Sequence, residues 1–527
     1  MGNLLKLKTT RFKQSRAIDT PSLNELMTCF ESDRGRVLNS AAVRRLQQKT
    51  QVFPLEKNSA VRSRLTHSLE VMQVGRFIVQ RICQDKSDLT AQLTHKQALA
   101  SELHEYERAL ESLVEMACVL HDVGNPPFGH FGEHAISHWF ANNAKALYFT
   151  HNACVLNEAE ESLFTDAEHF EGNAQAIRLV HSLMDLNLSY PLIASILKYT
   201  RCGNIARTSC DPSLDYLQKK VGYYYSEQEI VQAVQGSLGI ALGHRHPAAY
   251  IMEAADDISY CMADLEDAVE KEILSINILC DALQAEFAKV LTKFGISAKT
   301  LSETEQKTAF EAYLQAVKID ELKYSDLPDE HKMAFLCQQA LQAYKNEDIR
   351  KENAFFVSFR VAIVHPLVIH AKNRFLANID EVLEGNFNAA LLEDQSVAHA
   401  LSQTLKNVAL KHAFCHKEVE TLELQGYKVI NSLLDTFSCL LRLPAANFAQ
   451  ICREANYHHP IESRLIKRIG KKSIATYLKS LHSLPATSEA SHSVLEFYYR
   501  CRLLQDHISG MTDQFALDEY LSLNALA

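Results

Sequence analysis

The chain has 527 residues, of which 47% are hydrophobic and 22% charged, and this composition predicts a soluble globular protein larger than a single small core. Its formal net charge of -10 argues against a protein that coats nucleic acid over its whole surface, although it does not exclude a local basic patch. The 13 cysteines are scattered and form no Cys-x-x-Cys pair, which indicates a reducing compartment rather than a disulfide framework.

The N-terminal stretch MGNLLKLKTTRFKQ has neither a long apolar run nor a cleavage site, so we do not expect a signal peptide. No segment has the roughly 20 consecutive apolar residues that a bilayer-spanning helix needs. We therefore expect a cytoplasmic protein with no membrane partner.

Apolar residues recur at helical spacing along most of the chain, whereas glycine (17 residues) and proline (12 residues) are scarce. In the first half we expect helices at residues 67–82, 113–120, 130–143, 172–184 and 247–271. Ser226 and Glu229 have the spacing of a capping box before one more helix. In the second half we expect helices at residues 302–318, 329–345, 350–371, 396–412, 417–442, 461–482, 486–507 and 513–524. The pattern predicts an all-α fold, with a weakly marked boundary near residues 275–300.

The stretch from Leu120 to His134, LHDVGNPPFGHFGEH, combines the residue types that chemistry needs. His121 and Asp122 close a buried apolar helix, and the glycines and prolines after them end it. Because aspartate is rarely buried without a partner, we expect a metal ion beside this pair. His130 and Glu133 follow on a stiff turn, where they can face the same site.

His67 and Asp256 are candidates to complete this site, although a histidine taken alone is more often a core or surface residue than a ligand. Two imidazoles and two carboxylates form a mixed nitrogen and oxygen set, which is typical of Mn, Fe, Mg or Ni sites rather than of thiolate zinc sites. Four protein ligands on an octahedral ion leave two positions for water and a phosphate oxygen.

Asp256, Tyr260 and Asp264 are spaced at i, i+4 and i+8 and therefore share one face of the expected helix. Such a polar stripe is most often solvated surface. The apolar neighbours Ala255 and Ile258 indicate instead that at least one of the aspartates is partly buried.

His130, Glu133 and His134 also match the H-x-x-E-H pattern of the inverted zinc peptidases, which is a rival interpretation. That motif needs a continuous helix, whereas two glycines and two prolines place these residues at an irregular helix start. It also leaves the His121–Asp122 pair without a role, so we favour the first interpretation.

Taken in chain order, His67, His121–Asp122 and Asp256 resemble the H…HD…D signature of the HD-domain metal phosphohydrolases. One branch of that superfamily, the long bacterial deoxyguanosine triphosphate triphosphohydrolases, is similar in the strings RSRLTHSLEV, HDVGNPPFGHFGE, HFEGNAQAIRLV, MEAADDISYCMADLEDAV and ELQGYKVI. The resemblance spans most of the chain. It implies a metal-dependent enzyme that hydrolyses dGTP to deoxyguanosine and tripolyphosphate by attack at the α-phosphate.

The resemblance also implies an architecture. The all-α fold would consist of an HD-domain helical core with an additional helical C-terminal region. On this basis we expect an N-terminal segment at residues 1–50 and an HD-domain catalytic core at residues 51–275. Residues 276–527 would form a helical region that contributes to the substrate site and to oligomerisation.

The family's functional residues carry over to this chain one by one. Its metal ligands match His67, His121, Asp122 and Asp256. Its catalytic pair beside the scissile Pα–O5′ bond matches His130 and Glu133, whereas His134 matches no required residue. Arg64 and Lys220 match residues that contact the phosphates.

The remaining matches concern the nucleoside. Gln51 and Asp264 match contacts to the deoxyribose 3′-hydroxyl. Tyr260 matches a tyrosine packed under the sugar, where it crowds a 2′-hydroxyl, and Glu423 matches a residue near the base.

For the cofactor, the resemblance implies a divalent metal ion, with Mn or Mg expected first and Co or Fe also fitting the ligand set. It implies dGTP as the substrate, a homo-oligomer such as a hexamer, and single-stranded DNA as a modulator. A basic run could contact phosphate groups or could be a solvated helix face; its residues are Arg464, Lys467, Arg468, Lys471 and Lys472.

Two other functions stay open at this point. An HD-domain phosphohydrolase or phosphodiesterase acting on a broader range of dNTPs, or on another nucleotide, would use the same ligands. A non-catalytic nucleic-acid or regulatory assembly would keep the helical frame, but the loss of a ligand would be its sign, and no ligand is lost.

Overall fold

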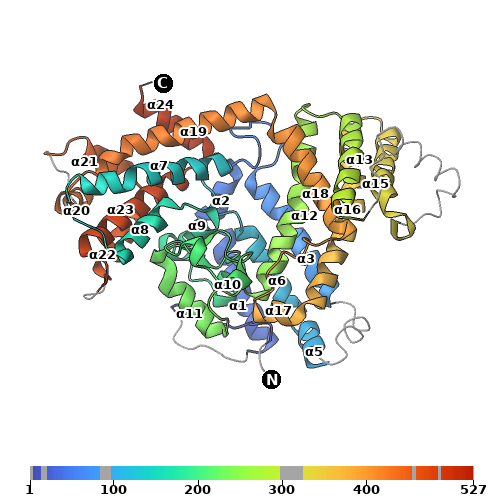
Figure 1. Ribbon diagram of the computed structural model, residues 1–527, viewed down its shortest axis with the longest axis horizontal. Helices are drawn as coiled ribbons and strands as arrows, with labels where there is room; N and C mark the ends of the chain where they lie inside the picture. Colours follow the sequence, from blue (N-terminus) through green and yellow to red (C-terminus); the bar gives the residue numbers. More distant parts are fainter. Residues whose placement is uncertain are drawn as a thin grey trace.

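The computed structural model describes residues 4–13, 21–83, 97–152, 154–296, 324–453, 458–484 and 488–525. As expected, these residues are almost entirely helical (Figure 1). Their named strands are β1 (Arg201–Cys202) and β2 (Val221–Tyr223), which pair in parallel. The prediction of an all-α chain is confirmed.

Three helices pack against one another at the centre of the molecule: α3 (Arg64–Cys83), α6 (Glu107–Leu120) and α12 (Pro247–Glu270). Their apolar residues at helical spacing are buried, as the sequence predicts. Gly75 allows α3 and α6 to approach closely, because a Cβ at that position would lie 2.7 Å from the sulfur of Cys118. The closeness of these helices brings side chains from all three to one point.

The other helices surround this centre. Those of the first half are α1 (Leu23–Leu38), α2 (Ala41–Arg45), α5 (Gln97–Glu105), α7 (Gly129–Phe149), α8 (Glu158–Glu168), α9 (Gly172–Arg178), α10 (Tyr190–Ile196) and α11 (Gln228–Leu238). Those of the second half are α13 (Ile276–Lys293), α15 (Lys332–Asn346), α16 (Lys351–Ala377), α17 (Ile379–Glu384), α18 (Val397–Ala409), α19 (Lys417–Phe437), α20 (Ala445–Arg453), α21 (Glu462–Leu465), α22 (Lys471–His482), α23 (His492–Ser509) and α24 (Asp513–Leu523).

Helices from the second half of the chain pack at both ends of the molecule. At one end, α16 packs against α3 and α12, and α18 packs against α12, with α13 and α15 beside them (Figure 1). At the other end, α19 runs alongside α7, and α23 packs on α8 (Figure 1). This end has its own hydrophobic core around Trp139, Phe437 and Leu504. The division of the chain at residue 275 stays a prediction.

Two local predictions are wrong. Ser226 does not cap a helix, because α11 begins at Gln228 and the Ser226 hydroxyl donates to Oε2 of Glu227 at 2.6 Å. The helix expected at residues 461–482 is interrupted, since α21 ends at Leu465 and α22 begins only after Gly470. The basic run therefore does not share one helical face. The helix expected at residues 302–318 lies outside the described residues.

By length and composition alone, α16 is apolar enough to cross a membrane. In the fold, its apolar side chains Phe355, Phe359, Ile363 and Leu367 are completely buried. The helix packs against α3, α12 and α15. Its hydrophobicity is thus used within the core of the fold, and the expected lack of a membrane partner stays a prediction.

Buried ion pairs join α23 to the first half of the chain. Arg178 on α9 donates to both carboxylate oxygens of Asp506, at 2.8 and 2.7 Å, and to Glu227 at 2.9 Å. Arg502 donates to Asp166 at 2.8 Å. Removing one partner of such a fully buried pair costs about 3–5 kcal/mol. The C-terminal helices are therefore firmly attached to the helices around the centre.

His246 begins α12 by accepting a hydrogen bond at Nδ1 from the N–H of Ala248, at 3.1 Å. Only the neutral ring can accept this bond, and burial lowers the pKa of His246 to about 4. Because this pKa lies below the value of an unfolded chain, the stabilisation is complete above pH 6.5 and is lost as the pH falls towards 4. Burial also lowers the pKa values of His181 and His507 to about 4, so all three act in the same direction.

We expect this group to lower the free energy of unfolding by about 2 kcal/mol between pH 7 and pH 5. Asparagine at this position keeps a helix-capping oxygen but does not titrate. The Tm of His246→Asn should therefore fall less over this range than the Tm of the wild type, as measured by differential scanning fluorimetry. The same change at the exposed His134 should leave the pH dependence of Tm as it is. An equal loss of Tm in all three proteins would contradict this role for His246.

Candidate metal and nucleotide site

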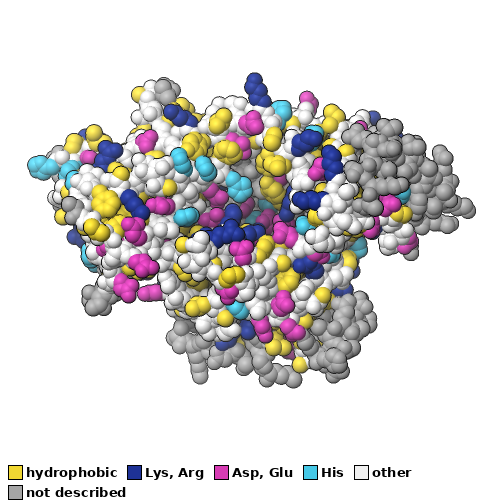
Figure 2. All heavy atoms as spheres, viewed as in Figure 1, with side chains coloured by type: hydrophobic (Ala, Val, Ile, Leu, Met, Phe, Trp, Pro, Cys, Tyr) yellow, Lys and Arg dark blue, Asp and Glu magenta, His cyan; other side chains and the backbone are white. Residues whose placement is uncertain are grey.

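A cavity of about 920 Å³ opens at the centre of the molecule. In the space-filling view, basic, acidic and histidine side chains gather around a hollow at this place (Figure 2). All of the site residues predicted from the sequence line the cavity except His67, which is completely buried. The structure thus brings together residues that lie as far apart in the chain as Gln51 and Glu423.

The predicted metal ligands converge from α3, the end of α6 and α12. His67, His121 and Asp256 each bring one ligand atom within 4.8 Å of the other two. The Nε2 atoms of both histidines lie 3.4 Å from Oδ1 of Asp256, and Oδ1 of Asp122 lies 3.5 Å from Nε2 of His121. Ligands that are about 2.1 Å from one ion are about 3.0–3.4 Å from each other. The atoms of His67, His121 and Asp256 therefore need only small shifts to hold one ion, and Asp122 lies beside this group, next to His121.

In Asp122 and Asp256, Oδ1 lies near Nε2 of His121 and Oδ2 lies near a cation. Oδ2 of Asp122 accepts from Nη1 of Arg64 at 2.6 Å, and Oδ2 of Asp256 lies 3.4 Å from Nζ of Lys198. Burial would raise the pKa of Asp122, but the positive charges of His121 and Arg64 outweigh it and lower this pKa to about 2. Both carboxylates are therefore held ionised and oriented.

The ring of His121 is oriented by its backbone. Its Nδ1 lies 2.7 Å from the carbonyl oxygen of Cys118, which can only accept, so Nδ1 carries the proton. Its Nε2 is buried and has no hydrogen-bond partner among the described residues. When Nε2 gives up its proton, this ring presents a lone pair to the cluster, which is the arrangement that a metal ligand requires.

His130 and Glu133 begin α7 directly after the turn with two prolines. Phe128 and Gly129 both adopt left-handed backbone angles, with φ of 62° and 57°. A Cβ at Gly132 would lie 2.0 Å from the carbonyl oxygen of Pro127, so only glycine fits there. This tight turn starts the helix at the cavity wall.

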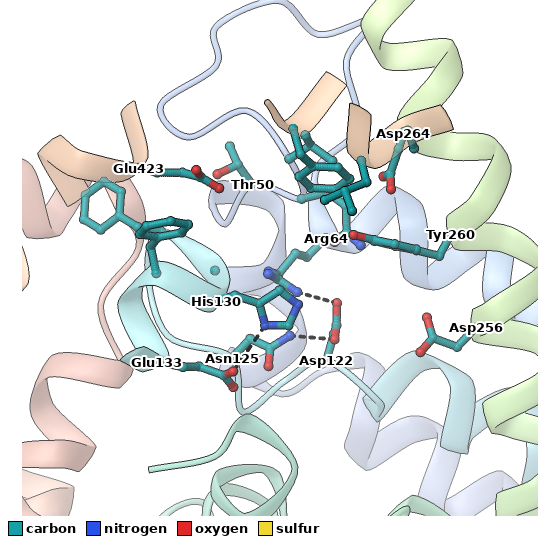
Figure 3. A pocket seen from close by; sticks show the side chains of 18 of the residues that line it. Thr50, Arg64, Asp122, Asn125, His130, Glu133, Asp256, Tyr260, Asp264 and Glu423 are labelled. Atoms are coloured by element: carbon teal, nitrogen blue, oxygen red, sulfur yellow. Dashed lines mark hydrogen bonds and ion pairs between the residues drawn. The ribbon is translucent and has the colours of Figure 1, made fainter. Parts of the chain in front are cut away.

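Nδ1 of His130 lies 3.3 Å from Oε2 of Glu133, and the two side chains point into the same cavity (Figure 3). Oε1 of Glu133 accepts from the N–H of Gly172 at 2.7 Å. The bond to Glu133 raises the pKa of His130, and the His130 charge lowers the pKa of Glu133 although burial opposes it. The pair therefore favours an imidazolium beside a carboxylate.

The inverted zinc-peptidase interpretation is wrong. His134 is exposed, and its ring stacks on His138 at a centroid distance of 5.8 Å. Among the described residues, the group of side chains placed to hold a metal ion is the cluster at His67, and it does not include His134.

The remaining predicted residues surround the cavity. Tyr260 and Asp264 lie along α12 beyond Asp256, and Glu423 faces them from α19 (Figure 3). Asp264 is completely buried, and burial raises its pKa well above the usual value. Gln51 has a buried Oε1 without a hydrogen-bond partner among the described residues.

Lys220 lies at the cavity wall and forms an ion pair with Glu171 at 3.0 Å. Sequence analysis missed this glutamate, and it also missed Lys198 beside Asp256. It missed Asn125 as well, which donates to Oδ1 of Asp122 at 2.6 Å. Asn125 lies within the stretch from Leu120 to His134 and could have been found there. The sequence signal for Lys198 is weaker, because this residue is marked only by the buried apolar run before it.

Comparisons with known proteins agree with this geometry. The HD domain family matches residues 64–189, which include the first three of the four predicted ligands. A probable deoxyguanosinetriphosphate triphosphohydrolase of Pseudomonas aeruginosa is 46% identical to this chain, over 96% of this chain and 94% of its own length. The chain belongs to the deoxyguanosinetriphosphate triphosphohydrolase family. Members from Serratia proteamaculans and Yersinia enterocolitica are 43% and 44% identical, over 97% and 95% of this chain and 96% and 94% of their own.

The family match ends before Asp256, which is contributed by α12. The geometry nevertheless places its carboxylate as close to both histidine rings as an ion would require. The recognition made from the sequence, namely a member of this family within the HD-domain proteins, is confirmed.

We expect His121→Ala to abolish metal binding, because it removes a ligand atom from the centre of the cluster. His134→Ala should leave the metal content unchanged, since this ring stacks on His138 outside the cluster. Elemental analysis of the purified variants after incubation with Mn²⁺ measures the difference. Metal retained by the His121 variant and lost by the His134 variant would contradict the assignment.

Proposed function

We propose that this protein hydrolyses dGTP to deoxyguanosine and tripolyphosphate by attack at the α-phosphate. One observation carries the proposal: a cluster of metal-ligand atoms and an imidazole–carboxylate pair share one cavity in a chain that belongs to this family. The same ligands would serve a broader dNTP phosphohydrolase, which is the alternative.

His67, His121, Asp122 and Asp256 would hold a divalent ion. Three of them fit such an ion as they stand, because the ligand atoms of His67, His121 and Asp256 lie within 4.8 Å of one another. Asp122 adjoins this group, with its Oδ1 at 3.5 Å from Nε2 of His121. A mixed donor set of this kind suits Mn or Mg first, with Co or Fe as further candidates. When bound, the ion would acidify a water molecule and neutralise charge on the phosphoryl group.

Three cations of the protein lie where the triphosphate would bind. Arg64, Lys198 and Lys220 all line the cavity. Arg64 uses one Nη1 contact on Asp122, and its Nε has no hydrogen-bond partner among the described residues. Its guanidinium therefore retains donors for a phosphate oxygen. Such cations stabilise the charge that develops on the phosphoryl group.

His130 is the candidate proton donor to the leaving 5′-oxygen. Its bond to Glu133 keeps the ring protonated at a higher pH than usual. Glu133 itself accepts a hydrogen bond from the N–H of Gly172, and this bond helps to fix the orientation of the carboxylate that contacts the His130 ring. A proton donor positioned in this way assists departure of an alkoxide, which is a poor leaving group without it.

The deoxynucleoside would occupy the space beside α12. Tyr260 lies one helical turn from Asp256, where its ring would pack under the sugar and exclude a 2′-hydroxyl by volume. Gln51 and Asp264 offer buried polar atoms for the 3′-hydroxyl. Glu423 faces the cavity from α19, on the side where the base would lie.

The assembly and its regulation are further proposals. Family membership leads us to propose a cytoplasmic homo-oligomer, with a hexamer as the first expectation, and single-stranded DNA as a modulator. The basic run from Arg464 to Lys472 is spread over two helices and a turn, and Arg468 is paired with Glu519 at 2.5 Å. A phosphate-contacting role for this run stays a prediction.

Product analysis tests the reaction directly. With Mn²⁺ present, the purified protein should convert dGTP to deoxyguanosine and tripolyphosphate in equal amounts, and other dNTPs should react more slowly. Chromatography of the nucleoside and phosphate products separates the outcomes. Pyrophosphate or orthophosphate as the primary product would rule out attack at the α-phosphate with release of the nucleoside.

His130→Ala tests the proton donor. We expect metal binding to be retained while kcat for dGTP falls by about 10²–10⁴-fold, which is the usual effect of removing a general acid. A substrate whose leaving group needs no proton should restore much of the lost rate. Metal content and kcat are measured on the same preparation. A metal-free variant would make His130 a ligand, and a fully active one would remove it from the mechanism.

A further inference from the structure

The carboxylate of Asp513, the first residue of α24, binds two segments that border the cavity. Its Oδ1 accepts from the N–H of Phe128 at 3.0 Å. Its Oδ2 accepts from the N–H of Thr50 at 3.1 Å and from the hydroxyl of the same residue. Asp513 is 2% exposed and does not itself line the cavity.

The first of these contacts supports the start of α7. Phe128 precedes Gly129 and His130, and its left-handed φ of 62° is unfavourable for a residue with a side chain. Such a conformation costs about 1–3 kcal/mol and persists only where the surroundings hold it. The bond from its N–H to Asp513 is one of the interactions that hold it. This bond therefore helps to set the direction in which α7 leaves the turn.

The second contact supports the opposite wall of the cavity. Thr50 precedes Gln51, and the carbonyl oxygen of Lys49 accepts from the N–H of Arg64 at 2.9 Å. The ammonium group of Lys49 is buried and donates to the carbonyl oxygens of Asn125 and Ser509. The corner between α23 and α24 is thus bonded to the segment before α3 and to the turn before α7.

An aspartate in the first turn of a helix usually stabilises that helix through its dipole. In α24, however, the side chain of Thr512 already accepts from the N–H of Phe515 at 3.3 Å. Both oxygens of Asp513 are used on segments that are distant in sequence. Its hydrogen bonds therefore stabilise the cavity walls rather than its own helix.

We propose that Asp513 is a positioning residue for the catalytic site, acting through Phe128 on His130 and through Thr50 on Gln51. The proposal rests on the function proposed above for His130. It makes the last helix of the chain part of the machinery for dGTP hydrolysis, although no atom of that helix lines the cavity.

The first test compares Asp513→Ala and Asp513→Asn with Asp518→Asn, an exposed aspartate on the same helix. We expect kcat for dGTP to fall about 10–100-fold in Asp513→Ala, because a displacement near 1 Å at a reacting group has effects of this size. Bound Mn²⁺ should stay at the wild-type level. Asp513→Asn keeps one acceptor oxygen and should recover part of the rate, and Asp518→Asn should match the wild type. Unchanged kcat in Asp513→Ala would overturn the proposal.

A double-mutant cycle separates positioning from a general loss of structure. If Asp513 acts mainly through His130, adding Asp513→Ala to His130→Ala should lower kcat by less than about 3-fold, because the two changes affect the same step. Factors that multiply in the double variant would show an independent effect and would overturn the proposed route through His130.

Hydrogen exchange gives a readout that does not depend on turnover. In Asp513→Ala, peptides containing Thr50 and residues 128–133 should exchange faster, whereas those from α12 should not change. If the wild type does not hydrolyse dGTP, the proposed function fails while this measurement still tests the hold of Asp513 on the two segments. No change in these peptides, or faster exchange throughout α3 and α12 together with loss of Mn²⁺, would overturn the proposal.

Discussion

Buried negative charge where α3, α6 and α12 meet is the constraint on which the rest of the structure depends. A carboxylate without a partner in such a place is strongly destabilising, so an acidic side chain that stays ionised there needs a cation or a set of donors. Asp122 has Arg64, and Asp256 has Lys198. Glu253, one turn before Asp256, has Arg245 at 2.6 Å. The chain supplies these cations from separate segments, and two of them, Arg64 and Lys198, line the cavity.

The C-terminal helices are connected to this centre by the same kind of interaction. Asp506 on α23 binds Gln175 and Arg178 of α9, and all three are buried. The first residue of α9, Gly172, donates its N–H to Glu133. The carboxylate of Asp506, near the end of the chain, is thus connected through α9 to Glu133 of the proposed catalytic pair. The similarity to the family likewise extends over almost the whole chain and is not confined to the HD domain.

The agreement between sequence and structure is best where the signal is local. The periodic apolar residues of α3, α6 and α12 predicted their helices, because each contact of a helical stripe repeats every three or four residues. The prolines and glycines between His121 and His130 predicted the turn, because proline lacks a backbone N–H and glycine adopts left-handed backbone angles without strain. Prediction failed at Ser226 and across residues 461–482. At Ser226 the hydroxyl bonds to Glu227 instead of capping a helix, and Gly470 interrupts the second segment.

The sequence by itself determined the helical class, the HD stretch and, through resemblance to a known family, a set of residues that, apart from the buried His67, line one cavity. Only the tertiary structure decided which charges meet. Lys198 and Asp256 are 58 residues apart, and Asp513 and Phe128 are 385 residues apart. The physical reason is that helical spacing governs neighbours within one or two turns, whereas ion pairs and hydrogen bonds between distant segments depend on how the helices pack. The partner of each buried carboxylate is therefore a property of the packing.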